Sequence, residues 1–189
     1  MFDFAWNFTL PHEGGLCDDA GDPGGITKYG VDLRMLKGLG ANSSGWTFLR
    51  KIGVALPVCR ASVISLSKAQ SAEIYRHEVW DRLGLGRFPR KVGAVIFDAG
   101  VNHGPAQALR FAQRAHNSLC PGAPLAVDGI LGPKTAAALC CDDENALARA
   151  MLDDREAWYH RHAEAVPAHQ KFLRGWLNRV ADLRTYLGL

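Results

Sequence analysis

The sequence predicts a mainly α-helical protein with one small β-hairpin. Two observations carry this prediction. Apolar residues recur at helical spacing through most of the chain, and one stretch rich in glycine and aspartate, residues 13–30, ends in the β-prone segment ITKYG. With 189 residues, 48% hydrophobic and 22% charged, the chain has the composition of a globular protein that can bury its own core. Disordered and collagenous classes are excluded.

The first expected element is a short amphipathic helix that ends at Glu13. Phe4, Ala5 and Phe8 have helical spacing, and the two glycines that follow Glu13 are typical of a helix end. Turn-forming residues continue to Gly25, and residues 26–31 are then expected to form one arm of the hairpin. The hairpin would carry the residues around it back toward Glu13.

Residues 32–65 are harder to interpret, because their glycines and Asn42 favour an irregular loop. Ser67 and Gln70 form a capping-box pattern that begins a helix reaching about Leu83. Further helices are predicted over residues 91–103, from Pro105, over 133–139, after Asp143 and over 170–187.

The nearly apolar helix at residues 91–103 carries two polar exceptions, Asp98 and Asn102. They are four residues apart and therefore share one helix face. Buried polar groups are costly unless they are hydrogen-bonded. These two side chains therefore either bond to neighbouring protein groups or face a cleft.

Charge, cysteine content and hydropathy indicate which partners, thiol states and membrane segments to expect. The formal charge of +3 is spread along the chain, as suits approach to an anionic polymer. Five cysteines is an odd number without a Cys-x-x-Cys pair, so we expect buried, unpaired thiols. The start MFDFAWNF lacks the pattern of a Sec signal peptide, and no apolar run is long enough to cross a bilayer. No three-ligand metal pattern stands out.

The carboxylates of residues 13–30 are the candidate catalytic groups. A negative helix end and apolar neighbours favour the protonated form of a carboxylic acid, the form that a general acid needs. Glu13 is thus the candidate acid, Asp22 the first choice for its partner and Asp19 the second, while Thr27 would hold a water molecule. Two such carboxylates cleave glycosidic bonds. An ordinary polar turn and a calcium loop are alternatives, although the EF-hand spacing is missing.

The segment EGG, the two aspartates Asp19 and Asp22, the segment PGG, Thr27 and Gly30 together resemble the signature of glycoside hydrolase family 108. Members of that family are lysozyme-like muramidases. The order of Glu13, Asp22 and Thr27 is also similar to the Glu/Asp/Thr triad of phage-type lysozymes, with one residue fewer between Asp and Thr.

The second half of the chain carries further resemblance to the same family. The segments FDAGVNHGPAQALRFAQ and DGILGPKT are similar to its peptidoglycan-binding-type helical region, and FLRGWLNR resembles its C-terminal pattern. The resemblance implies one compact unit over 1–189, with a muramidase lobe at 1–90 packed against a peptidoglycan-binding-type lobe at 91–189.

The resemblance implies a lysozyme-like fold and cleavage of the β-1,4 bond between N-acetylmuramic acid and N-acetylglucosamine. Its partner would be the glycan strand, with no cofactor, metal, nucleic acid or stable membrane insertion. A protein made in the cytoplasm without a Sec signal would reach the periplasm or cell wall through a holin-type pore or a dedicated secretion route. Catalysis is assigned to Glu13, Asp22 and Thr27, and substrate binding to Asp19, Tyr29, Tyr75, Asp98 and Asn102.

Three other functions are open at this stage. A peptidoglycan-binding or localisation protein would keep the fold without turnover. A lytic transglycosylase would also use a single glutamate but would release an anhydro product. A small nucleic-acid-binding protein would need a basic recognition helix, and the sequence offers none.

Overall fold

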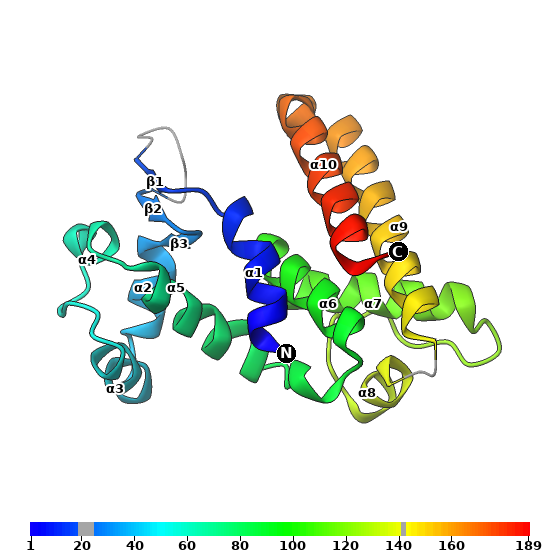
Figure 1. Ribbon diagram of the computed structural model, residues 1–189, viewed down its shortest axis with the longest axis horizontal. Coiled ribbons are helices and arrows are strands. Elements are labelled where there is room, and N and C mark those ends of the chain that lie inside the picture. The colour runs from blue at the N-terminus through cyan, green and yellow to red at the C-terminus, as the bar shows by residue number, and fades with distance from the viewer. Residues whose placement is uncertain (19–24, 141–142) are drawn as a thin grey trace. The chain divides into compact units, whose positions relative to one another are not determined.

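The computed structural model describes residues 1–18, 25–140 and 143–189 (Figure 1). The chain forms two compact units: a small unit, Thr9–Glu78, and a large unit, Met1–Phe8 with Val79–Leu189. The prediction of a mainly α-helical protein with a small β element is confirmed. The predicted division into lobes at 1–90 and 91–189, packed as one compact unit, stays a prediction.

The small unit contains the only sheet among the described residues. Helix α1 (Phe2–His12) leads into strands β1 (Leu16–Cys17), β2 (Thr27–Lys28) and β3 (Val31–Asp32). The strands are antiparallel in the order β1-β2-β3, so the sheet has one strand more than the predicted hairpin. Between β2 and β3, Tyr29 and Gly30 have φ angles of 49° and 76°. Two consecutive positive φ values mark the type I′ turn that fits the twist of a hairpin.

The expected irregular loop over residues 32–65 is wrong, because three helices form there: α2 (Leu33–Leu39), α3 (Ser43–Lys51) and α4 (Arg60–Ile64). Side-chain caps explain the first two. Asp32 Oδ1 accepts a hydrogen bond from Met35 N at 2.6 Å, and Asn42 Oδ1 accepts one from Gly45 N at 2.8 Å. Such caps offset the low helix propensity of the glycines.

Helix α5 (Lys68–Tyr75) begins at the predicted capping box. Gln70 N donates to Ser67 Oγ, and Ser67 N donates to Gln70 Oε1. The helix continues as a π-helical stretch, Arg76–Asp81, across the boundary between the units. The predicted helix from Ser67 is therefore present but changes its hydrogen-bond pattern after Tyr75.

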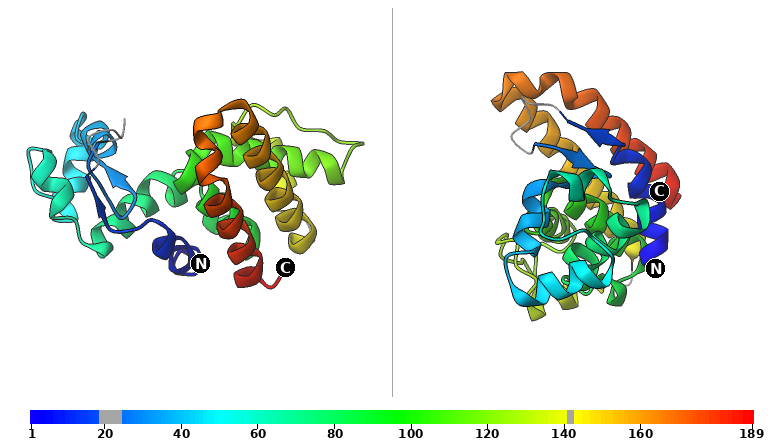
Figure 2. Two further views of the ribbon diagram at one scale, coloured as in Figure 1. Left: turned by 90° about the horizontal axis from the view of Figure 1, so that it is seen from above. Right: turned by 90° about the vertical axis from the view of Figure 1, so that its left-hand side faces the viewer.

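The large unit is a cluster of helices. After a 3₁₀ turn (Leu85–Arg87) come α6 (Arg90–His103), α7 (Pro105–Leu119), α8 (Pro133–Leu139) and α9 (Glu144–Ala165), then a second 3₁₀ turn (Pro167–His169) and α10 (Gln170–Leu187). Helices α9 and α10 lie side by side as a hairpin, and α6, α7 and α9 contact one another (Figures 1 and 2). No described helix has both the length and the apolar character that crossing a membrane requires.

The core of the large unit joins the first residues of the chain to α6. The Phe2 ring stacks on Trp6 and meets Phe97 edge-on, with a centroid distance of 5.5 Å to the latter. Trp80 contacts both phenylalanine rings. All four rings are buried.

The cysteine prediction needs correction. The four cysteines in the described part of the chain, Cys17, Cys59, Cys120 and Cys140, are unpaired as expected but exposed. Each lies on a surface strand or at a helix end and not on a buried helix face.

Candidate active site

Glu13 directly follows α1, as the sequence predicts. Its backbone N–H donates to Leu10 O at 3.1 Å, and Gly14 then turns the chain with a φ angle of 68°. A residue with a side chain rarely adopts that angle, so the glycine determines the direction in which the chain leaves the helix. Glu13 is half-buried between these two features.

Gly30 places the Glu13 carboxylate beside a tyrosine hydroxyl. A Cβ atom added to Gly30 would lie 2.6 Å from Glu13 Oε2 and 2.6 Å from Tyr75 OH. Both oxygens therefore approach the backbone of the β2–β3 turn at a point that only glycine leaves open. Glu13, Gly30 and Tyr75 come from three separate elements of the small unit, and the fold brings them together.

The turn itself is tied to α5. Ser71, which is fully buried, donates from Oγ to Tyr29 O at 2.9 Å. This bond fixes the turn on the helix that carries Tyr75, four residues further along. The position of the tyrosine hydroxyl relative to Gly30 is thus set by the turn and the helix together.

A pocket of about 470 Å³ opens next to this cluster, within the size range of ligand sites. Its lining includes Tyr29 and residues on both sides of Glu13 in the chain, but not Glu13 itself. The lining residues are Leu10, Pro11, Gly14, Gly15, Tyr29 and Lys68. A Cβ atom at Gly14 or Gly15 would meet no atom within 4 Å, so the backbone there is open to an approaching molecule.

The other predicted catalytic residues are placed only in part. Thr27 lies on the middle strand, opposite Cys17, and its hydroxyl donates to Gly25 O at 3.3 Å. Asp19 and Asp22 lie outside the described residues. The roles of Glu13, Thr27, Tyr29 and Tyr75 in this site stay predictions.

Asp98, in the large unit, belongs to a buried ion network. Its carboxylate accepts hydrogen bonds from Arg155 Nη1 at 2.6 Å and from Arg179 Nη2 at 2.7 Å. The residue is 0% exposed, and the two guanidinium groups hold the pKa of its carboxyl far below the usual range despite its burial. A substrate would have to open this network to reach the carboxylate. We therefore withdraw Asp98 from the predicted substrate-binding residues.

Asn102 and His103 extend the network through Tyr159. The tyrosine hydroxyl accepts from Asn102 Nδ2 at 2.9 Å and from Arg155 Nε at 3.0 Å, and it lies 2.7 Å from His103 Nε2. The hydroxyl thus accepts two hydrogen bonds, which uses both of its lone pairs, so its one proton is directed at His103 Nε2. The imidazole is therefore neutral and carries its own proton on Nδ1. Burial is the main cause that lowers the pKa of His103, to about 3. The substrate role of Asn102 stays a prediction.

The model of the family described as Glycosyl hydrolase 108 matches residues 3–104, which is 102 of the 189 residues. The chain belongs to this family. A second model, described as Predicted Peptidoglycan domain, matches residues 107–181. The resemblance expected from the sequence is confirmed, and the matches support a peptidoglycan-degrading or peptidoglycan-binding function.

The glycosyl hydrolase 108 chain is also similar to a solved structure, that of SagA from Brucella abortus. The two are 26% identical, the match covers 99% of this chain and 94% of that one, and the TM-score is 0.76. The similarity extends over the full lysozyme-like fold. The comparison with curated proteins found no match.

One feature of this family member could not be assigned from the sequence. Arg155 and Tyr159 are four apart on α9, but nothing in their spacing shows that Arg155 pairs with Asp98 and Tyr159 with Asn102 on α6.

The residues of the described ranges form no group of three or more histidine, cysteine or acidic side chains able to hold a metal ion.

Proposed function

We propose that the protein is a muramidase that hydrolyses the β-1,4 bond between N-acetylmuramic acid and N-acetylglucosamine. One observation carries this proposal: the Glu13 carboxylate and the Tyr75 hydroxyl both lie close to Gly30, within the segment that matches a glycosyl hydrolase family. A carboxylic acid at the glycine-rich end of a helix, beside an open pocket, is suited to protonating a leaving oxygen.

In the proposed reaction, Glu13 donates its proton to the glycosidic oxygen as the bond to the sugar breaks. Positive charge that develops on the sugar needs a second carboxylate, which either stabilises it or activates the attacking water. Asp22 is proposed for that role, with Asp19 as the alternative and Thr27 as the group that holds the water. Where the second carboxylate stabilises the sugar, Glu13 takes its proton back from the attacking water; where the second carboxylate activates the water, that carboxylate takes the proton and Glu13 is reprotonated from solvent.

The test is the substitution Glu13→Gln, which keeps the shape of the side chain but removes the transferable proton. Positioned general acid catalysis typically contributes roughly 10²- to 10⁴-fold, so clearing of a purified cell-wall suspension should slow by about that factor. Glu73→Gln is the matched control, because Glu73 is an exposed glutamate of the same unit. Equal rates for both variants would remove Glu13 from catalysis.

A second candidate is a peptidoglycan-binding protein without turnover, which the match over residues 107–181 favours. This candidate predicts that the unmodified protein sediments with cell walls and clears none of them. Mass spectrometry of released fragments separates hydrolysis from transglycosylation, since only the latter leaves an anhydro sugar. Export through a holin-type pore or a secretion system is proposed with the muramidase function.

A further inference from the structure

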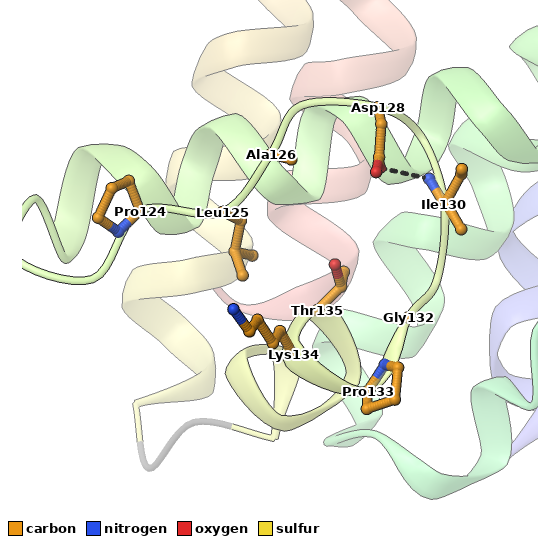
Figure 3. A pocket seen from close by; sticks show the side chains of 9 residues that line it. All are labelled: Pro124, Leu125, Ala126, Asp128, Ile130, Gly132, Pro133, Lys134 and Thr135. Atoms are coloured by element: carbon orange, nitrogen blue, oxygen red, sulfur yellow. Dashed lines mark hydrogen bonds between the residues drawn. The ribbon is translucent and has the colours of Figure 1, made fainter.

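The large unit contains a second pocket, of about 520 Å³, in the segment between α7 and α8. Figure 3 shows it from close by, with side chains from the loop and the start of α8 around it. Its lining residues are Pro124, Leu125, Ala126, Asp128, Ile130, Gly132, Pro133, Lys134 and Thr135. The volume is in the range of sites that bind a small molecule or a short segment of a polymer.

Internal bonds hold the outer wall of this pocket in place. Asp128 Oδ1 accepts from Ile130 N and from Gln113 Nε2, each at 2.8 Å. Gly129 N donates to Gln113 Oε1 at 2.9 Å, and Gln113 is almost fully buried on α7. The wall is therefore attached to a helix and is formed before any ligand binds.

Gly129 completes this attachment by close approach. Its φ angle is 76°, and an added Cβ atom would lie 2.6 Å from Ala106 O. Only glycine allows the loop to lie so near α7. The motif DGILGPKT of the sequence thus serves to build the wall of the pocket.

The chemistry of the lining is an apolar surface with one available cation. Proline, leucine, isoleucine and alanine form most of the wall. The Asp128 carboxylate is engaged by the loop, whereas the Lys134 amine has no hydrogen-bond or ion-pair partner in the part of the chain that the structure describes. Figure 3 shows this amine directed toward Leu125 and away from Asp128. Such a lining fits a ligand that carries a carboxylate beside small apolar groups.

We propose that this pocket binds the peptide stem of peptidoglycan, with Lys134 paired to a stem carboxylate and the apolar wall in contact with alanine methyl groups. The proposal rests on the proposed function, since it names the part of that substrate which this pocket recognises. The pocket lies inside residues 107–181, the segment matched by the peptidoglycan domain model. The sugar would then be cut by one unit and the peptide held by the other.

The test measures binding of the soluble tripeptide L-alanyl-γ-D-glutamyl-meso-diaminopimelic acid to the full chain by calorimetry. Lys134→Met should weaken binding about fivefold to tenfold, because one charge-assisted contact at a partly exposed site is lost. Lys171→Met is the matched control: it removes the same charge from an exposed lysine of the same unit outside the pocket and should leave binding unchanged. Equal weakening by both variants would overturn the proposal.

A second variant tests the pocket by shape. Ala126 is an exposed residue of the lining, so Ala126→Phe would fill the pocket and should abolish binding of the tripeptide. A fully amidated tripeptide, which lacks the carboxylates, should bind the unmodified protein as weakly as the acidic tripeptide binds Lys134→Met. Unchanged affinity in Ala126→Phe would overturn the site. The outcome is separate from the muramidase question, because Glu13→Gln should bind the tripeptide normally, while both pocket variants should cleave peptide-free glycan at the normal rate.

Discussion

The Glu13 and Asp98 regions each combine an acid with a tyrosine, yet the protein uses the two acids differently. Glu13 is half-buried at a chain reversal, where its carboxylate lies beside Gly30 and Tyr75. Asp98 is fully buried in the middle of α6 and accepts hydrogen bonds from two arginines. The neighbours of the first acid in the chain line an open pocket, whereas the second acid has its carboxylate oxygens occupied by protein groups.

The difference separates the surroundings of the acid proposed for catalysis from those of an acid that is paired within the protein. Gly30 leaves room for the Glu13 carboxylate, and Gly14 and Gly15 leave open space beside it in the chain. Asp98 lies among buried apolar residues of its helix and has no access to solvent, so the two arginines must compensate the charge of its carboxylate within the protein. Substitutions in the first region should change activity, and substitutions in the second should change stability.

The largest effect is expected from Asp98→Asn. This change leaves the Arg155 and Arg179 charges buried without their counter-ion, which typically costs about 3–5 kcal/mol in the free energy of unfolding. Urea denaturation followed by circular dichroism measures the loss. Asp153→Asn, which breaks an exposed pair with Arg184 in the same unit, should cost less than about 1 kcal/mol.

If Asp98→Asn were instead as stable as the unmodified protein but slow in cell-wall clearing, the comparison would be reversed. Asp98 would then act in the site, and its burial in this structure would belong to a closed state. Activity and stability must therefore be measured on the same preparation of each variant.

A smaller effect, on activity, is expected from Gly30→Ala. The added methyl group would meet Glu13 Oε2 and Tyr75 OH at 2.6 Å, so one of these oxygens must move. Misplacing a catalytic group by about 1 Å can cost on the order of 100-fold in rate. The rate of cell-wall clearing measures this effect.

Gly53→Ala separates the clash from backbone strain. Gly53 has the same φ angle, 76°, but its added Cβ atom would lie at an ordinary 3.6 Å from Gln70 Nε2. Both substitutions should lower stability by about 1–2 kcal/mol, as for an L-residue in the left-handed region. Only Gly30→Ala should slow cleavage, and an equal loss of rate in both would assign the effect to strain.

Much of the fold could be predicted because its signals are local. The capping box at Ser67, the glycines after Glu13 and the proline at position 105 each define a helix end within a few residues. The helices between residues 32 and 65 could not be predicted, since their glycines resemble a loop. Their caps, Asp32 and Asn42, become convincing only when the hydrogen bonds are seen.

The candidate site also has one part that local sequence predicts and another part that depends on contacts between distant residues. The placement of Glu13 at a helix end follows from neighbouring residues, and the structure has it there. Its meeting with Tyr75 depends on how a turn packs on α5, which no linear pattern records. For Asp98 the sequence left two roles open, because the deciding partners, Arg155 and Arg179, are 57 and 81 residues away.

The smallest effect concerns pH and the histidine next to Asp98. Burial, and then the charges of Arg155 and Arg179, lower the pKa of His103 to about 3, below its unfolded value of about 6.5. Between these values the unfolded chain binds more protons than the folded one, so stability rises with pH. From pH 7 to 5 the free energy of unfolding should fall by about 1 kcal/mol for each unit below 6.5.

His103→Gln should reduce that slope, because Gln retains an acceptor for the Tyr159 hydroxyl but does not titrate. The range from pH 7 to 5 lies above the titration of Asp98, whose lowered pKa affects stability only below about pH 4. Urea denaturation at several pH values compares the two proteins, and all other titrating groups are common to both. An unchanged slope in His103→Gln would mean that the imidazole is protonated in the folded protein. The network around Asp98 would then hold three positive groups and one carboxylate, and such a network would need solvent to compensate its charge. That result would contradict the distinction between a buried Asp98 region and an open Glu13 region.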